Sequence, residues 1–258
     1  MGGALLKGLL ARGFDPKSVI IQDPAPAPDV IELASRHGIA VRGAISELAT
    51  APSVILAAVK PQIMEQVFPG LARLAGPDTL TISIAAGRSI ASFEKHLPNG
   101  AAVVRTMPNT PAAIGRGVTV CVANANVSEA QKLLTNELMS AVGEVGWVED
   151  EALMDAVTAV SGSGPAYVFL LAECLAEAGH RAGLDEKLAA QLARATVAGS
   201  GELLHRAVES PAVLRQNVTS PGGTTAAALS VLMASGGLDD LMTKAVEAAR
   251  NRGRELAK

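Results

Sequence analysis

The sequence predicts an α/β protein in two parts: a mostly parallel sheet with crossover helices, followed by a region of helices only. Short runs rich in β-branched residues alternate with helical patterns through the first part, which is typical of a parallel sheet with crossover helices. After about Glu149 these runs disappear, and apolar residues recur at helical spacing to the end. A chain of 258 residues is long enough for two domains. We therefore expect domains at 1–149 and 150–258.

The expected strands are the short β-branched runs of the first part, and each lies between helical patterns or turn residues. In order, they are Ser18–Gln22, Gly38–Val41, Ser53–Val59, Thr79–Ile84, Ala101–Arg105, Gly117–Val122 and Gly143–Val148. Helices are expected before and between them, where apolar residues recur every three or four positions. They are Gly2–Arg12, Asp29–His37, Gln62–Leu74, Ser89–His96 and Ser128–Val142.

In the second part, a helix that begins near Pro165 is apolar on almost every side. Such a helix must be covered by other helices, and a subunit interface is a plausible place for that burial. Its longest apolar stretch, Ala166–Leu175, is interrupted by Glu173 and is much shorter than a membrane span. We therefore expect no membrane segment.

Composition argues against several classes of function. Hydrophobic residues make up 49% of the chain and aromatic residues only 2%, so the core must consist mainly of Ala, Val, Leu and Ile. The formal net charge of −3 argues against a nucleic-acid partner. Cys121 and Cys174 form no metal or redox motif, and Met1–Leu10 is followed by no signal-peptide cleavage site. We expect a cytoplasmic protein without a metal.

The N-terminus looks like the second part of a dinucleotide-binding βαβ unit, because Gly2 and Gly3 open a helix and a strand follows it. Free N–H groups at such a helix start can bind a pyrophosphate, although an ordinary helix start explains the same glycines. The preceding strand and two earlier glycines of the full pattern are not in the sequence. We therefore expect a Rossmann-like domain that lacks its first strand. The two strands that would flank the missing one should then either leave a gap or collapse together. We also expect that the start codon was assigned too late or that the gene is incomplete.

Asp23 follows the strand Ser18–Gln22 and lies 21 positions after Gly2. At this place a carboxylate can accept hydrogen bonds from both ribose hydroxyls of NAD, and it would repel a 2′-phosphate. The residue therefore favours NADH over NADPH. A turn before Pro24 explains the Asp equally well, so both interpretations stay open.

Three later strand ends carry small or polar residues, in the segments 57–61, 83–87 and 105–111. The carboxyl ends of parallel strands form one edge of a sheet, where ligands bind. Small residues there let a nicotinamide or a ribose lie against the backbone. An ordinary strand-to-helix loop explains each segment alone, but three at one edge favour a ligand site.

Two glycine-containing segments precede helices in the second part. Gly222 and Gly223 come before the helical pattern Ala226–Met233, so free N–H groups can converge on an anion such as a carboxylate. A glycine turn with a Thr N-cap is the alternative. The segment Ser161–Pro165 lacks both the G-x-S-x-G pattern and the phosphate-loop Lys, so we interpret it as a helix start.

Together these motifs resemble the pyrroline-5-carboxylate reductase family. The resemblance rests on AAVKP at 57–61, SIAAG at 83–87, RTMPNTP at 105–111, SGSGPAYVF at 161–169 and NVTSPGGTT at 217–225, and it covers essentially the whole chain. It implies a nicotinamide-binding domain and a helical domain that interlocks with that of a second subunit, often in a ring of dimers. It also implies reduction of the cyclic imine 1-pyrroline-5-carboxylate to L-proline, the last step of proline biosynthesis, by hydride from NADPH or NADH.

The resemblance also assigns roles to single residues. Thr225 is the expected catalytic residue, whose hydroxyl hydrogen-bonds the ring nitrogen of the substrate. The expected substrate-binding residues are Val218, Ser220, Gly222, Gly223 and Thr224. The expected cofactor-binding residues are Ala58, Lys60, Pro61, Ala86, Gly87, Asn109 and Asn217, together with Gly2 and Asp23 from the N-terminal pattern.

Two alternatives remain. A β-hydroxyacid-dehydrogenase-like enzyme needs a general base, usually a Lys, but Lys187 and Lys244 lie in no Gly- or Asn-rich helix motif. Hydride transfer to a protonated imine needs no such base, which agrees with the scattered histidines of the chain. The second alternative is a catalytically impaired fragment, because the pyrophosphate loop is incomplete.

Overall fold

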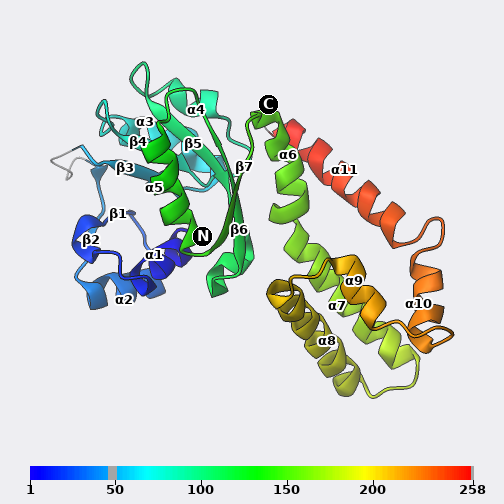
Figure 1. Ribbon diagram of the computed structural model, residues 1–258. Helices are drawn as coiled ribbons and strands as arrows, with labels where there is room; N and C mark the ends of the chain where they lie inside the picture. The colour runs from blue at the N-terminus through cyan, green and yellow to red at the C-terminus, as the bar shows by residue number, and fades with distance from the viewer. Residues whose placement is uncertain (46–50, 257–258) are drawn as a thin grey trace. The chain divides into compact units, whose positions relative to one another are not determined.

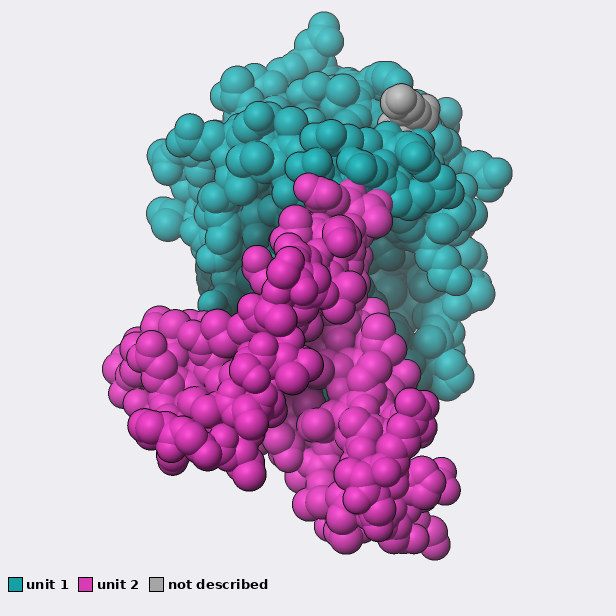
Figure 2. Space-filling model, turned by 90° about the vertical axis from the view of Figure 1, so that its right-hand side faces the viewer, with its two compact units in different colours: residues 1–162, 250–258 teal, residues 163–249 magenta. Residues whose placement is uncertain are grey.

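The computed structural model describes residues 1–45 and 51–256 and divides into two compact units (Figures 1 and 2). Unit 1 comprises Met1–Gly162 together with Arg250–Lys258, and unit 2 comprises Ser163–Ala249. Unit 1 contains all the strands, and unit 2 contains helices only, within the described part of the chain. The predicted order of a sheet domain followed by a helical region is therefore confirmed.

The described residues of unit 1 form two sheets, and the strands lie within two residues of the predicted ends. The smaller sheet pairs β1 (Ile20–Gln22) with β2 (Ala40–Arg42) in parallel. The larger sheet has the order β3-β4-β5-β6-β7, with bounds Val54–Ala57, Leu80–Ser83, Ala102–Met107, Gly117–Ala123 and Gly143–Trp147. Its pairs are parallel except β5–β6. Only a short 3₁₀ helix, Thr110–Ile114, connects β5 to β6, and a parallel crossover needs a dozen residues or more.

The two sheets are not joined to each other: within the described ranges, no strand pairs with both β1 and β3. The interruption predicted at this place is therefore present, as a gap and not as a collapse. Helix α1 (Gly2–Ala11) still packs on the larger sheet, because Leu5 is fully buried in the same core cluster as Leu80 and Ile82.

Helices cover both faces of the larger sheet (Figure 1). Val103 and Val104 are consecutive in β5, and both are fully buried, but they belong to different core clusters. This follows from the alternation of side chains along a strand. One cluster includes Phe68 and Phe93, whose rings meet edge to face at 4.8 Å. The remaining helices of this part are α2 (Pro28–His37), α3 (Met64–Ala72), α4 (Ile90–Glu94) and α5 (Glu129–Ser140).

The second half of the chain is helical, as predicted. It begins with η5 (Glu151–Leu153), α6 (Met154–Val157) and a π-helical turn, Thr158–Gly162. It continues with α7 (Gly164–Arg181), α8 (Glu186–Arg206), α9 (Pro211–Asn217), α10 (Thr224–Leu232) and α11 (Leu238–Leu256). Helices α7 and α8 lie side by side (Figure 1), and Ala189 and Ala193 of α8 are each only 3% exposed. Small side chains at such a contact permit the close approach of two helices.

Helix α7 leaves most of its apolar side chains exposed, including Phe169 at 63%. The helical run Glu151–Arg181 is long and apolar enough to cross a membrane by length and composition, because it contains an 18-residue window with a mean hydropathy of 1.3. The prediction of no membrane segment rested on the shorter stretch Ala166–Leu175, which α6 and the π-helical turn extend. Length and composition alone are weak evidence for a membrane span, because an interface helix passes the same test.

Candidate active site

The carboxyl ends of three neighbouring strands bring together residues that the sequence placed at a ligand-binding edge. Strands β3, β4 and β5 are parallel, and Ala57, Ser83 and Arg105 stand in one row across them. The predicted cofactor residues that follow these strands are Ala58, Lys60, Pro61, Ala86, Gly87 and Asn109. They therefore lie along one edge of unit 1, where open parallel sheets bind ligands.

This edge is open and lined by small residues. Gly87 has a φ of +69°, and a Cβ added there would meet nothing within 4 Å. Ala58 is exposed at the end of β3. A Cβ added at Gly2 would lie 3.0 Å from the Cβ of Ala58, so the N-terminus of α1 also reaches this edge. The first N–H groups of a helix have no acceptor within it and attract anions. The residues present therefore fit a dinucleotide, whose phosphates the first N–H groups of α1 would hold.

Asp23 takes part in a turn. Its Oδ1 accepts a hydrogen bond from the backbone N–H of Ala25 at 2.9 Å, and its own N–H donates to the carbonyl of Arg42 at 3.1 Å. The turn interpretation is therefore confirmed. A carboxylate has room for several hydrogen bonds, so the ribose contact stays a prediction.

Asn109 has a structural bond that the sequence did not reveal. Its side chain carbonyl accepts from the N–H of Val118 at 3.0 Å, and the residue is 9% exposed. This bond holds the start of the 3₁₀ helix Thr110–Ile114 against β6. The contact of Asn109 with a cofactor stays a prediction.

Hydrogen bonds and an ion pair made by buried side chains stabilise the strand ends at the same edge. The hydroxyl of Thr106 donates to the carbonyl of Ser83 at 2.9 Å, and the Ser83 hydroxyl accepts from the N–H of Ala85 at 3.2 Å. Arg105 is 6% exposed, and its Nη1 lies 2.8 Å from Oε1 of Glu151. Arg105 stands in a motif noted in the sequence, but its partner lies 46 positions away, so no local pattern could reveal the pair.

Sequence reasoning also missed Arg88, which directly follows Gly87. Its guanidinium donates two hydrogen bonds to the carbonyl of Pro61, so it connects two of the loops at the edge. A single sequence contains no signal for this contact, because Arg88 and Pro61 lie 27 positions apart.

In unit 2, the turn between α9 and α10 brings the predicted substrate residues together. They are Val218, Ser220, Gly222, Gly223 and Thr224, with Thr225 in the first turn of α10. Asn217, predicted to bind the cofactor, is the last residue of α9 and stands with this group. The remaining predicted cofactor residues all belong to unit 1.

The start of α10 has the features of an anion site. Gly223 is the N-cap and has no side chain to occupy the first N–H groups of the helix. The alternative of a Thr N-cap is therefore wrong, because the helix already begins at Thr224. Gly222 has a φ of +67°, and space is open around its Cα. A carboxylate fits there because the N–H groups and the helix dipole both favour a negative charge.

The Thr225 hydroxyl has no hydrogen-bond partner among the residues that the structure describes. The nearby hydroxyls of Thr219 and Ser230 differ, because they donate to backbone carbonyls at 2.6 and 2.7 Å. Thr225 therefore offers a free donor and acceptor beside the anion site.

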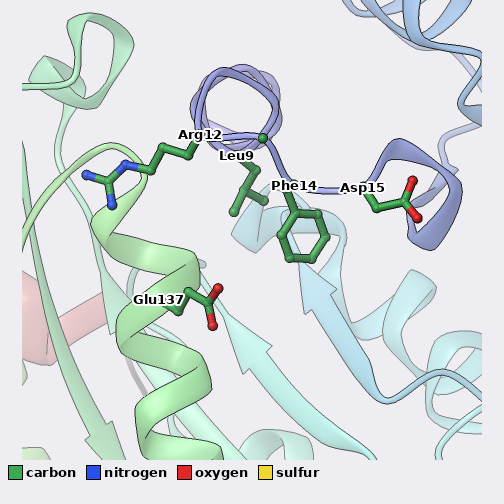
Figure 3. A pocket seen from close by; sticks show the side chains of 6 residues that line it. Leu9, Arg12, Phe14, Asp15 and Glu137 are labelled. Carbon is green, nitrogen blue, oxygen red and sulfur yellow. The ribbon is translucent and has the colours of Figure 1, made fainter.

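A hollow of about 410 Å³ lies at the C-terminal end of α1 (Figure 3). It is lined by Leu9, Arg12, Gly13, Phe14, Asp15 and Glu137. Since α1 begins beside Ala58, this end lies at the opposite edge of the sheet. The side chains of Arg12 and Asp15 point in opposite directions in Figure 3, and Arg12 donates to the Ser140 hydroxyl at 2.9 Å. The charges do not converge on a ligand, so we place no site there.

The remaining candidates for metal or thiol chemistry give no site. In the described ranges, no three His, Cys, Asp or Glu side chains come together as metal ligands would. Burial raises the pKa of Cys121 from 9.0 to about 12, so its thiol stays neutral at physiological pH.

Comparison with known families gives two matches along the chain. Residues 151–256 match the family described as pyrroline-5-carboxylate reductase dimerisation. Residues 1–87 match the family described as NADP oxidoreductase coenzyme F420-dependent.

Curated relatives and solved structures are similar over the whole chain. The pyrroline-5-carboxylate reductase of Pseudomonas aeruginosa is 41% identical over 100% of the chain and 93% of its own length. That of Synechocystis is 42% identical over 100% and 96%. The structure of the Coxiella burnetii reductase matches with a TM-score of 0.92 at 37% identity, covering 100% of this chain and 95% of that one. The Plasmodium falciparum pyrroline carboxylate reductase with NADP bound matches with a TM-score of 0.82 at 30% identity, covering 100% and 95%.

Proposed function

The chain belongs to the pyrroline-5-carboxylate reductase family, and from this premise we propose that it reduces 1-pyrroline-5-carboxylate to L-proline with NADPH or NADH. This is the last step of proline biosynthesis. The observation that carries the proposal is the glycine-opened start of α10, with the free Thr225 hydroxyl in its first turn. A β-hydroxyacid dehydrogenase is set aside, since relatives that match the whole chain are named pyrroline-5-carboxylate reductase.

The cofactor binds along the carboxyl edge of unit 1. The first N–H groups of α1, which begins at Gly2, would hold its phosphates, and Asp23 would bind its ribose. The small residues after β3 and β4 would hold its nicotinamide half, and Lys60, Pro61 and Asn109 would make further contacts. Asn217 stays a predicted cofactor contact. The open space at Gly87 and the exposed Ala58 support this placement.

The substrate carboxylate binds the free N–H groups at the start of α10, between Gly222 and Thr225. The Thr225 hydroxyl accepts the N–H of the protonated imine and so orients the ring. Val218 and Ser220 complete the contacts from the preceding turn. A carboxylate at a helix start and one neutral hydroxyl together select a small ring that carries an acid next to an imine nitrogen.

The bound cofactor supplies a hydride to the imine carbon. The electron pair of the C=N double bond moves to the nitrogen, which already carries its proton, so the product is a neutral amine. No group of this chain must remove a proton in that step. Reacting atoms must come within about 3.5 Å, so positioning is the task of the cofactor and substrate residues.

The protein self-associates, and we propose a homodimer, which in turn can build a ring of dimers. The match of residues 151–256 to a dimerisation family supports it, as do the exposed apolar side chains of α7. The proposed domains are residues 1–149 and 150–258, so their boundary lies 13 residues before Gly162, where the main segment of unit 1 ends. A second copy, and not a membrane, covers α7, and the enzyme acts in the cytoplasm without a nucleic-acid partner.

The test is reduction of 1-pyrroline-5-carboxylate by the purified protein with NADH and with NADPH, next to Thr225→Ala and Thr225→Ser. One hydrogen bond to a charged group contributes about 1.5–3 kcal/mol, so Thr225→Ala should lower kcat/KM by about 10- to 100-fold. The Ser variant keeps the hydroxyl and should retain most activity. Oxidation of a hydroxyacid without reduction of the imine would show that the proposal is wrong, and normal rates in Thr225→Ala would remove Thr225 from the mechanism.

A further inference from the structure

Arg88 joins two of the loops proposed to line the cofactor. Its Nε and Nη2 both donate to the carbonyl oxygen of Pro61, at 3.1 and 2.6 Å. Arg88 directly follows Gly87 in the loop after β4, and Pro61 follows Lys60 in the loop after β3. One side chain therefore fixes the distance between the two loops.

A third hydrogen bond anchors the guanidinium to the body of unit 1. Its Nη1 lies 2.8 Å from Oε1 of Glu65 in α3, and the Arg88 side chain is 25% exposed. The other carboxylate oxygen of Glu65 lies 3.5 Å from Nε2 of His96, and the His96 ring contacts the buried Phe68. The planar guanidinium is thus held in one orientation, which is the geometry that makes Arg effective in a two-bond contact.

The sheet gives these loops little support of its own. The backbone hydrogen bonds between β3 and β4 end with the bond from the N–H of Ile84 to the carbonyl of Ala57, at 3.2 Å. Gly87 has no side chain, and the space around it is open. Val59 and Ala85 pack in one core cluster, and beyond the strand ladder Arg88 adds the side-chain hydrogen bonds that join these two loops in the described part of the chain.

We propose that Arg88 is a positioning residue for the cofactor: it acts through Pro61 and Gly87 by holding the two loops at the separation that binding requires. The inference rests on the proposed function for the location of the cofactor. Ordering a binding loop before the ligand arrives removes part of the entropic cost of binding. We call the two hydrogen bonds from Arg88 to Pro61 the clamp. Loss of the clamp should therefore weaken cofactor binding and leave the chemical step nearly unchanged.

The experiment compares Arg88→Met and Arg88→Lys with the wild-type protein. Met keeps an unbranched apolar side chain without donors, and Lys keeps the charge but cannot make the planar two-bond contact. The dissociation constants of NADH and NADPH are measured by fluorescence titration. Hydrogen exchange of the segment 58–64 is measured without cofactor. We expect Arg88→Met to raise the dissociation constant about tenfold, which corresponds to about 1.4 kcal/mol, with faster exchange and with Arg88→Lys in between.

Two controls separate the clamp from general effects of charge. Arg36 makes an exposed pair with Glu32 at 2.6 Å in α2, so Arg36→Met removes an Arg–Glu pair of the same unit without touching a loop. It should bind cofactor as the wild type does. Glu65→Gln removes the ion pair of Arg88 but keeps the two bonds to Pro61, so it should raise the dissociation constant less than Arg88→Met does.

Unchanged cofactor affinity in Arg88→Met would overturn the clamp, and so would an equal loss in Glu65→Gln, because the ion pair alone would then explain it. If Arg88→Met does not fold, Arg88→Lys decides by the same two measurements. In the assay, the KM for the cofactor should rise while kcat stays within about twofold; a fall in kcat alone contradicts the proposal. If the wild-type protein binds NADH but does not reduce the imine, the proposed function is wrong. The clamp is still tested in that case, by the dissociation constants and by hydrogen exchange.

Discussion

At the scale of single residues, substitution of Gly222 can separate an effect on backbone strain from an effect on substrate binding. Its φ of +67° is a left-handed conformation that costs other residues about 1–2 kcal/mol. Gly236 has a φ of +77° in the same unit, and an added Cβ has open space at both positions. Alanine should therefore lower the stability of unit 2 by a similar amount at either position.

Only Gly222→Ala should also impair the substrate site, because the new methyl group and the strained backbone lie at the proposed carboxylate site. We expect its KM for 1-pyrroline-5-carboxylate to rise several-fold, while Gly236→Ala keeps the wild-type value. Steady-state kinetics and thermal unfolding of both variants check this. A similar rise in KM in both would mean that general loss of stability explains it.

Cys121 should make stability depend on alkaline pH. Burial raises its pKa from 9.0 to about 12, so the unfolded chain loses the thiol proton at lower pH than the native protein does. The stabilisation is complete below pH 9.0 and is lost as pH rises towards about 12, at up to about 1.4 kcal/mol per pH unit. Urea unfolding between pH 8 and 11 should show a steeper decline in wild type than in Cys121→Ala. Parallel curves would contradict the prediction.

At the scale of elements, Glu151 connects three of them. Its Oε1 accepts from Arg105 of β5 and from the N–H of Ile90 at the start of α4, both at 2.8 Å, while Glu151 itself begins η5. Arg105 is buried, so loss of the carboxylate leaves its charge without a partner. This single side chain attaches the start of the helical region to the sheet.

We therefore expect Glu151→Gln to lower the free energy of unfolding by about 1–3 kcal/mol, since the pair is largely shielded from water. Glu32→Gln removes the exposed partner of Arg36 and should cost less than about 0.5 kcal/mol. Urea denaturation of both variants measures the difference. Equal losses would show that the Glu151 contacts contribute no more than a surface pair does.

At the scale of the whole molecule, the exposed apolar side chains of α7 require a partner. Phe169, Leu170 and Leu171 are 63, 56 and 51% exposed in the single chain. Burial of a side chain of this size stabilises by about 1.5–3 kcal/mol. A dimer interface made by residues 150–258 is the proposed way to gain that energy.

Phe169→Glu should shift the protein towards monomers in sedimentation velocity experiments, while its cofactor affinity stays within about twofold. Leu133→Glu is the matched control, because Leu133 is 67% exposed but lies on α5 of unit 1. The control should sediment as the wild type does. A wild-type protein that is monomeric at micromolar concentration would contradict the proposed dimer.

Much of the fold could be predicted from local sequence patterns. The β-branched runs located all the described strands to within two residues, because strand formation and burial depend on the same short apolar segments. The antiparallel direction of β6 was not predicted, since it follows from the short connection after β5. Arg88 and Glu151 were missed because their partners lie 27 and 46 positions away, and a single sequence contains no signal for such pairs.

The sequence by itself determined the fold class, the family and the helix starts at Gly2 and after Gly223. These features depend on motifs whose residues are neighbours in the chain. Only the tertiary structure decided which distant side chains hold the loops. The carbonyl of Pro61 is fixed by Arg88, and the N-cap of α10 is Gly223 and not a threonine. The physical reason is that hydrogen-bond partners are chosen by distance in space, and folding sets that distance independently of separation along the chain.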